Sequence, residues 1–232
     1  MKRVYQIRRT VAAAIVLVVA VFTLYSNADL WQPVTGPNAQ HAEATGQAAD
    51  VLDGLAVKGR APKTGYDRAQ FGDGWQKVNG CDTRNVILHR DLTNATVNDK
   101  CQVTSGTLND PYTGKTIEFR RGASSSADVQ IDHVVALGDA WQKGAQQLTG
   151  DERERLANDP LELLAVDGPA NQQKSDGDAA TWLPPNKAFR CQYVARQIAV
   201  KKKYRLWVSQ AEKDAMKRVL SACPGQQLPS AK

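Results

Sequence analysis

The sequence of 232 residues lacks the features of a multi-span membrane protein or a fibrous protein. Its apolar run from Thr10 to Tyr25 is shorter than the roughly 20 residues that a spanning helix needs. It has no internal repeat, and its contents of hydrophobic residues (42%) and charged residues (23%) are ordinary for a globular protein. This composition excludes collagen-like, disordered and multi-span membrane proteins, and predicts one globular domain.

The N-terminal apolar run has the flanks of an export signal. It is preceded by four cations and no acid, and Ser26-Asn27-Ala28 after it offers small residues for cleavage. We therefore predict that residues 1–28 are a signal peptide or a single N-terminal membrane anchor. Either outcome places the remaining chain outside the cytoplasm, secreted or anchored, with membrane contact only through an uncleaved N-terminal segment.

Cysteine is scarce, and its spacing excludes a common kind of metal site. The four cysteines contain no close CxxC pair, which a four-cysteine metal site would need. An even number of cysteines in an exported chain favours two disulfides. Of the three possible pairings we expect Cys81–Cys101 and Cys191–Cys223, because each closes a loop within one segment and contributes roughly 3 kcal/mol through chain entropy.

The formal net charge of +6 is a poor guide until the charges are located. Removal of residues 1–28 removes four cations, which leaves 26 basic and 24 acidic residues and a net charge of +2. Residues 187–218 carry ten cations and two acids, whereas residues 139–178 carry nine acids and four cations. The charge is therefore segregated along the chain, which creates an oriented field.

The composition and the positions of Gly and Pro divide the exported chain into three parts. We expect a polar linker at 29–48, a domain at 49–224 and a disordered tail at 225–232. Hydrophobic spacing predicts an α+β fold. We expect strands at 85–88, 116–119 and 161–166. We expect helices at 49–57, 136–148, 151–157 and 187–204, and a last helix that ends at Ala222 and begins with a capping box formed by Ser209 and Glu212.

Three stretches carry the polar residues of interest: Gln130 to Val135, Asp159 to Val166 and Gly168 to Lys174. Neighbouring side chains of a strand point to opposite faces, so Asp132 and His133 share a site only where a strand ends or bends. A strand–strand–helix arrangement provides this. Strand 161–166 pairs with the first, the chain turns at 167–169, and a helix beginning near Asn171 returns an amide to the strand end.

This order resembles the HNH, or His-Me finger, endonucleases, whose pattern runs Asp-His-(Ile/Val), Asn-Leu-x-x-Leu and Asn-x-x-Lys. It is most similar to free-standing exported HNH proteins of bacteria and, more distantly, to the C-terminal nuclease domain of GmrSD-type restriction enzymes. The resemblance extends over 49–223 and includes further short motifs: Cys81–Asn85, Asp110–Gly114, Ala140-Trp141, Asn158–Pro160 and Trp182–Pro185. It implies a ββα-metal core with additional helices and short N-terminal strands.

The resemblance also implies roles for individual residues. His133 is the general base, with an ordinary pKa suited to that task. Asp132 and Asn171 supply oxygen ligands to one divalent metal ion, and such ligands favour Mg²⁺ or Mn²⁺. Lys174, one turn into the helix, is expected to contact phosphate. Arg84 is expected to do the same, with a salt bridge to Asp82 or Asp91 as the alternative.

Glu162 is the point where the sequence departs from the family pattern, which has Asn there to hold the loop that carries the histidine. A carboxylate only accepts hydrogen bonds, whereas an amide also donates them. We expect Glu162 to accept the ring N–H of His133 and so to orient the imidazole. The alternatives are that Asn158 takes over this role or that Glu162 is a solvated side chain.

The cations after residue 187 suggest a surface that follows a phosphate backbone. We predict that Lys201, Lys202 and Lys203 contact nucleic acid without reading its sequence. The predicted function is an exported, monomeric, metal-dependent HNH endonuclease that cleaves DNA, or RNA as an alternative, with little sequence specificity. The competing hypothesis is a catalytically degenerate HNH fold that binds nucleic acid or the cell envelope.

Overall fold

Helices and small antiparallel sheets alternate along the chain, so the fold is α+β, as predicted. The computed structural model describes residues 47–122 and 126–229. The predicted signal or anchor, most of the predicted linker and the last three residues lie outside these ranges. No helix within them is long and apolar enough to cross a membrane.

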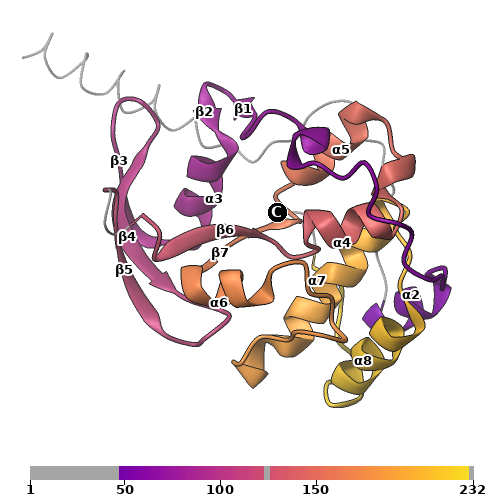
Figure 1. Ribbon diagram of the computed structural model, residues 1–232. Coiled ribbons are helices and arrows are strands. Elements are labelled where there is room, and N and C mark those ends of the chain that lie inside the picture. Colours follow the sequence, from indigo (N-terminus) through magenta and orange to yellow (C-terminus); the bar gives the residue numbers. More distant parts are fainter. Residues whose placement is uncertain (1–46, 123–125, 230–232) are drawn as a thin grey trace, which may run out of the picture. The chain divides into compact units, whose positions relative to one another are not determined.

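The first part of the described chain holds short helices and two of the sheets (Figure 1). Helix α2 and the short 3-10 helix η2 come first, and α3 lies between the strands of the two sheets. Strand β1 pairs with β2, and β3, β4 and β5 form a three-stranded sheet in that order. The bounds are α2 Ala48–Gly54, η2 Arg68–Phe71, β1 Lys77–Val78, β2 Cys81–Asp82, α3 Thr83–Asp91, β3 Thr93–Val97, β4 Val103–Asn109 and β5 Thr116–Arg120.

The second part is mainly helical and contains one further pair of strands. Strand β6 pairs antiparallel with β7, and α6 follows β7 directly. The bounds are β6 Val129–His133, α4 Leu137–Gln142, η3 Ala145–Gln147, α5 Gly150–Ala157, β7 Leu163–Asp167, α6 Gly168–Lys174, η4 Lys187–Phe189, α7 Arg190–Lys203 and α8 Gln210–Ser221.

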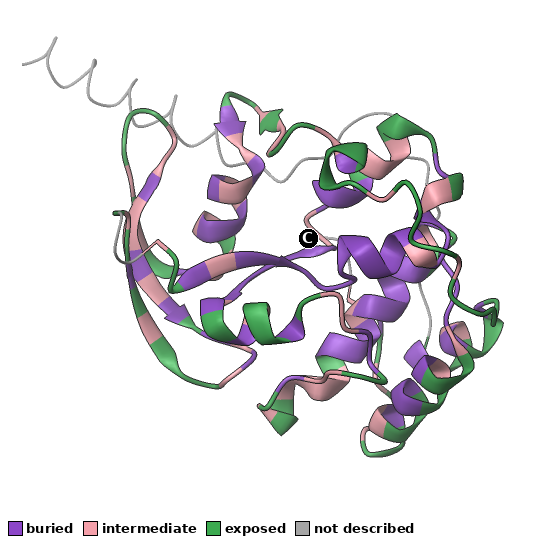
Figure 2. Cartoon of the chain, viewed as in Figure 1, coloured by how far each residue is buried: buried purple, intermediate pink, exposed green. Residues whose placement is uncertain are grey.

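The β6–β7 pair lies between two hydrophobic cores. On β7, Leu163 and Ala165 face the core beneath α3 and the three-stranded sheet, whereas Leu164 and Val166 face the core formed with the helices. This alternation follows from the pleat of a strand. A strand buried on both faces is apolar throughout, which explains the continuous hydrophobic run in β7. Figure 2 shows the pair as a mostly buried band through the domain.

Several predicted elements are confirmed, and one is wrong. Strand β5 and helices α2, α5, α7 and α8 lie close to their predicted positions, and Ser209 and Glu212 form the predicted capping box. The predicted strand at 85–88 is instead part of α3. Its apolar run is too short to distinguish a strand from a helix. Asp82 decides the outcome, since its side chain accepts the backbone N–H of Asn85 at 2.8 Å and caps the helix.

The start of α6 differs from the predicted turn at 167–169. The side chain of Asp167 accepts the N–H of Ala170 at 2.8 Å, so the helix already begins at Gly168. Pro169 suits this position because the first helical turn needs no N–H there. Gly168 is needed for space: a Cβ atom at this position would lie 2.1 Å from the carbonyl oxygen of Ala127.

Both predicted disulfides, Cys81–Cys101 and Cys191–Cys223, are present. The predicted disordered tail requires a correction for residues 225–229. The carbonyl of Gln226 accepts the N–H of Ala48, and Leu228 is buried in the helical core. These contacts return the end of the described chain to the start of α2.

Candidate active site

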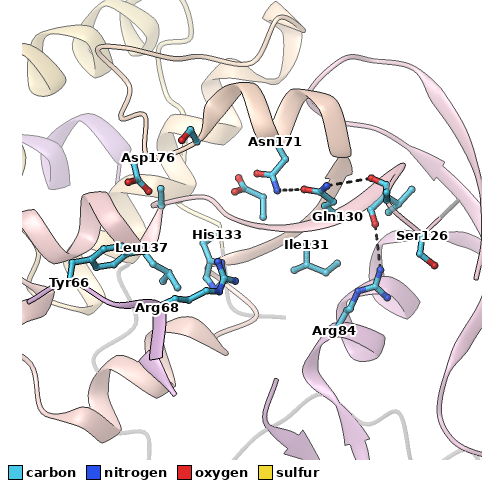
Figure 3. Close-up of a pocket in the computed structure, with 15 residues that line it drawn as sticks. Tyr66, Arg68, Arg84, Ser126, Gln130, Ile131, His133, Leu137, Asn171 and Asp176 are labelled. Carbon is cyan, nitrogen blue, oxygen red and sulfur yellow. Dashed lines mark hydrogen bonds between the residues drawn. The ribbon is translucent and has the colours of Figure 1, made fainter. Parts of the chain in front are cut away.

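The end of β6 opens into a cavity of about 490 Å³. Four of the predicted site residues line it: Arg84, Asp132, His133 and Asn171. Figure 3 shows the labelled His133, Asn171 and Arg84 around this space. The other predicted residues, Glu162, Lys174 and the lysines at 201–203, do not line it. The structure therefore brings together the predicted base and both predicted metal ligands.

Asp132 is held by two buried partners. Its carboxylate is only 5% exposed. Oδ1 accepts from the ammonium of Lys174 at 2.9 Å, and Oδ2 accepts from the hydroxyl of Tyr112. Burial raises the pKa of Asp132, and the bonds from Lys174 and Tyr112 oppose that rise. These two bonds fix the carboxylate at the cavity wall, and each oxygen keeps a second lone pair.

Lys174 does not lie at the surface, where a phosphate contact would need it. Its side chain is fully buried, and Nζ donates to Asp132 and, at 2.7 Å, to the carbonyl oxygen of His133. Lys174 is the last residue of α6, and its side chain points from the helix towards the end of β6. Lys174 therefore supports the backbone and carboxylate of the Asp132–His133 pair from below.

The His133 ring has a defined tautomer. Its Nε2 lies 3.0 Å from the carbonyl oxygen of Ala157. A carbonyl only accepts hydrogen bonds, so Nε2 carries the proton and Nδ1 keeps a free lone pair. Burial, reinforced by the nearby charge of Arg68, lowers the pKa of His133 to about 3. The imidazole is therefore neutral at physiological pH, but burial makes it a weaker base than the ordinary pKa expected from the sequence would give.

Glu162 does not contact the His133 ring, and this corrects the predicted hydrogen bond. Its carboxylate is fully buried and accepts the backbone N–H of Val135 at 3.2 Å, while its own carbonyl accepts the N–H of Val134. Burial raises the pKa of Glu162 well above its ordinary range, which favours the uncharged acid. Glu162 therefore holds the loop that follows the histidine. Asn158, the alternative, instead bonds the backbone of Gln76 and Glu154.

Asn171 lies at the centre of α6 and is oriented by a residue of β6. Its Nδ2 donates to Oε1 of Gln130 at 2.9 Å, and Figure 3 shows this contact as a dashed line. Because the nitrogen side of the amide is engaged there, the oxygen is the atom that remains for a ligand in the cavity. Gln130 was not predicted, although it directly precedes the Ile131-Asp132-His133 motif in the sequence.

Two arginines border the cavity at different ends of β6. Arg68, from η2, is exposed and lies beside His133, whereas the half-buried Arg84 lies near the start of the strand, where it donates to the carbonyl of Val129 at 3.5 Å. Neither alternative salt bridge of Arg84 forms. The two ends of β6 are about 13 Å apart at 3.3 Å per residue. No sequence pattern indicated Arg68.

The three consecutive lysines of α7 do not form one surface. Lys201 is fully buried, 3.0 Å from Glu212 and 3.5 Å from Asp139. Burial lowers its pKa, but these two carboxylates outweigh that effect and the pKa is raised. Lys203 pairs with Asp159 at 2.7 Å. Only Lys202 is exposed. Successive residues of a helix point in different directions, which is why the run is divided.

Comparison with known families relates this geometry to an activity class. The model of the GmrSD restriction endonucleases, C-terminal domain, matches residues 82–219, more than half of the chain. The chain belongs to this family. A protein of Arthroderma benhamiae described as an uncharacterized secreted protein is 37% identical over 194 residues, which cover 82% of this chain and 92% of that protein. No solved structure matches the chain.

Membership of the GmrSD C-terminal domain family indicates a nuclease-related function. The matched residues contain Asp132, His133, Glu162 and Asn171. Tyr112, the buried partner of Asp132, also lies within the match, in the Asp110–Gly114 motif that the sequence analysis interpreted only as a turn. Arg68 and its neighbours precede Asp82 and lie outside it. One wall of the cavity is therefore formed by residues that precede the family match, among them Arg68.

The oxygen atoms at the cavity suit a hard divalent cation whose other ligands are water molecules and substrate oxygens. The described residues contain no group of three or more His, Cys, Asp or Glu side chains arranged to hold a metal ion. Mg²⁺ typically binds through one or two carboxylates together with waters and substrate phosphates. Asp132 and Asn171 supply one carboxylate and one amide oxygen at the same cavity, and that donor set fits such an ion.

Proposed function

We propose that this protein is an exported, metal-dependent HNH endonuclease that hydrolyses phosphodiester bonds of DNA, with RNA as the alternative substrate. In this proposal β6, β7 and α6 form a ββα-metal core. The observation that carries it is the meeting of Asp132, His133 and Asn171 at one cavity. Family membership supports the reaction class.

His133 is the proposed general base. Its Nδ1 lone pair accepts a proton from the attacking water, and the bond from Nε2 to the carbonyl of Ala157 holds the ring and stabilises the positive charge that the imidazole gains. The ring of Trp75, parallel to the imidazole within 4° at 5.9 Å, limits its movement on one side. Lys174 holds the carbonyl of His133, and Glu162 holds the backbone of the two residues after it, Val134 and Val135.

Asp132 and Asn171 are the proposed ligands of one Mg²⁺ or Mn²⁺ ion. When bound there, the ion offsets negative charge on the reacting phosphate and assists departure of the 3′ oxygen. Tyr112 and Lys174 keep Asp132 in position, and Gln130 keeps the Asn171 oxygen directed to the cavity. The protein thus supplies a preorganised pair of oxygens rather than a closed metal cage.

The two arginines favour a polymeric substrate. Because Arg68 and Arg84 border opposite ends of β6, about 13 Å apart, two phosphates of one strand fit them better than a single small phosphodiester does. Arginine matches phosphate oxygens through its planar set of donors. Such backbone contacts do not read sequence, so we propose little sequence preference.

Localisation outside the cytoplasm forms part of the proposal. The relative from Arthroderma benhamiae is described as secreted, and the two disulfides of this chain suit an oxidising compartment. We also propose that the protein acts as a monomer, with membrane contact only if residues 1–28 are retained.

The degenerate binding module remains as the second candidate, because Glu162 replaces the family asparagine. Its contact with Val135 weakens that candidate, since the loop after the histidine is still held. A plasmid nicking assay with Mg²⁺ or Mn²⁺ separates the two. We expect nicking that EDTA and His133→Ala abolish, while His89→Ala, on α3, retains it. Equal nicking by His133→Ala, or none with any metal, would refute the nuclease.

A further inference from the structure

A second cavity, of about 160 Å³, lies beside His133. It shares Arg68, His133 and Leu137 with the first cavity, so the two are neighbours. The remaining lining is different in kind. It consists of Phe71, Trp75, Ala157 and two glycines at positions 72 and 74, and no acidic side chain borders it.

The wall of this cavity is held in place before any ligand binds. Asp67 caps η2 by accepting the N–H of Ala69 at 2.8 Å, and the N–H of Gln76 donates to Asn158 at 2.9 Å. Between them Gly72 has a φ of +99° and passes so near α5 that a Cβ atom would lie 2.7 Å from Cγ of Glu154. The segment from 67 to 76 is therefore anchored at both ends and at its centre.

The chemistry of the lining selects a flat apolar group attached to an anion. Trp75 is half-buried and Phe71 is buried, so the cavity has aromatic walls. Its volume is well below the 300 Å³ or more of sites for drug-sized ligands, which leaves space for one small ring system. Arg68, where the two cavities join, provides a positive charge beside the ring site.

We propose that this second cavity binds one nucleobase, next to the phosphate that is cleaved. The base packs against Trp75, and the adjoining phosphate contacts Arg68. This inference rests on the proposed function and specifies its substrate class. A base enters such a pocket only after leaving its stack and its pair. The preferred substrate is accordingly single-stranded or locally opened nucleic acid.

The test compares two single strands that differ only in their bases. Binding of a thymidine oligonucleotide and of a fully abasic oligonucleotide of equal length is measured in EDTA, so that cleavage does not interfere. Base stacking on an aromatic side chain strengthens binding by about 5- to 160-fold. We expect the wild-type protein to prefer the thymidine strand by at least about fivefold, and Trp75→Leu to reduce the preference by at least about fivefold.

Two variants distinguish base binding from mere support of His133. Trp75→Phe keeps a ring and should retain part of the preference, and it provides the comparison if Trp75→Leu does not fold. Trp182→Leu removes another half-buried tryptophan that lines neither cavity, and should keep the full preference. Equal weakening of both oligonucleotides by Trp75→Leu, with an unchanged preference, would overturn the proposal.

Cleavage rates add a second readout. For the wild-type protein we expect a lower KM on single-stranded than on duplex DNA, and Trp75→Leu should raise the single-strand KM more than it lowers kcat. Failure of the nuclease proposal is distinct, because it appears as loss of nicking while the base preference in EDTA persists. Normal nicking with no base preference would instead reject the base site alone.

Discussion

Replacement of Lys174 by methionine tests whether the buried support of Asp132 is essential to the fold. Methionine keeps much of the apolar stem but removes the ammonium, so the Asp132 carboxylate loses its buried cation and keeps only the Tyr112 hydroxyl, and the His133 carbonyl loses the Lys174 donor. Loss of one partner of a buried ion pair destabilises a protein by about 3–5 kcal/mol. That is a large share of the 5–15 kcal/mol that is typical of total stability.

The assay is urea unfolding with the disulfides intact, at pH 7 and in EDTA so that no metal neutralises the carboxylate. With an m value of about 2 kcal/mol per M, the midpoint of Lys174→Met should fall by about 2 M. Lys202→Met, on the exposed face of α7, is the matched control and should remain within about 0.5 kcal/mol of the wild type.

The double variant Lys174→Met/Asp132→Asn shows where the loss arises. Asparagine removes the unpaired charge and still accepts from Tyr112, so the double variant should be more stable than the sum of the single losses implies, by about 0.5–3 kcal/mol. A midpoint shift below about 0.5 M for Lys174→Met, or strict additivity in the double variant, would refute the assignment of Lys174 as the essential partner of Asp132.

Three further predictions concern other parts of the site. The pKa of Glu162 is raised in the folded state, so Glu162 stays protonated there while it ionises in the unfolded chain. As the pH rises from about 4.5 towards that folded pKa, the free energy of unfolding of the wild type should therefore fall by about 1.4 kcal/mol per pH unit relative to Glu162→Gln. Urea unfolding of both proteins from pH 5 to 8 checks this, and a constant difference between them would contradict it. Gly168→Ala should lower stability and activity together, since its Cβ would overlap the carbonyl of Ala127, as thermal unfolding and nicking rates would show. Arg84→Ala should reduce the salt dependence of DNA binding by about one phosphate contact, and an unchanged salt slope would contradict this.

Elements with a local signal were predictable from the sequence. Ser209 and Glu212 predicted the start of the last helix because a capping box involves only four consecutive residues. The cysteine spacing was enough to choose both disulfides. At the site, the Asp132-His133 pair and Asn171 were identified as a group, and the structure places them at one cavity.

The remaining errors come from contacts between residues distant in sequence. Glu162 bonds the backbone of Val134 and Val135 because the loop that contains them folds back onto it. No short sequence pattern predicts that fold-back. Lys174 and Lys201 are expected from the sequence to contact phosphate, yet each is buried against carboxylates from another element. Arg68 was missed because an arginine in an irregular segment gives no periodic signal.

The position of β6 and β7 between two cores has a consequence for how the proposed nuclease activity would be lost. The disulfide Cys81–Cys101 joins β2 to the segment just before β4, and Cys191–Cys223 joins α7 to the end of α8. Each side is thus reinforced on its own, while Asp132 and His133 depend on both. The proposed activity should disappear with whichever side opens first under heat or proteolysis, so a partly unfolded molecule would retain structure on the other side but no cleavage.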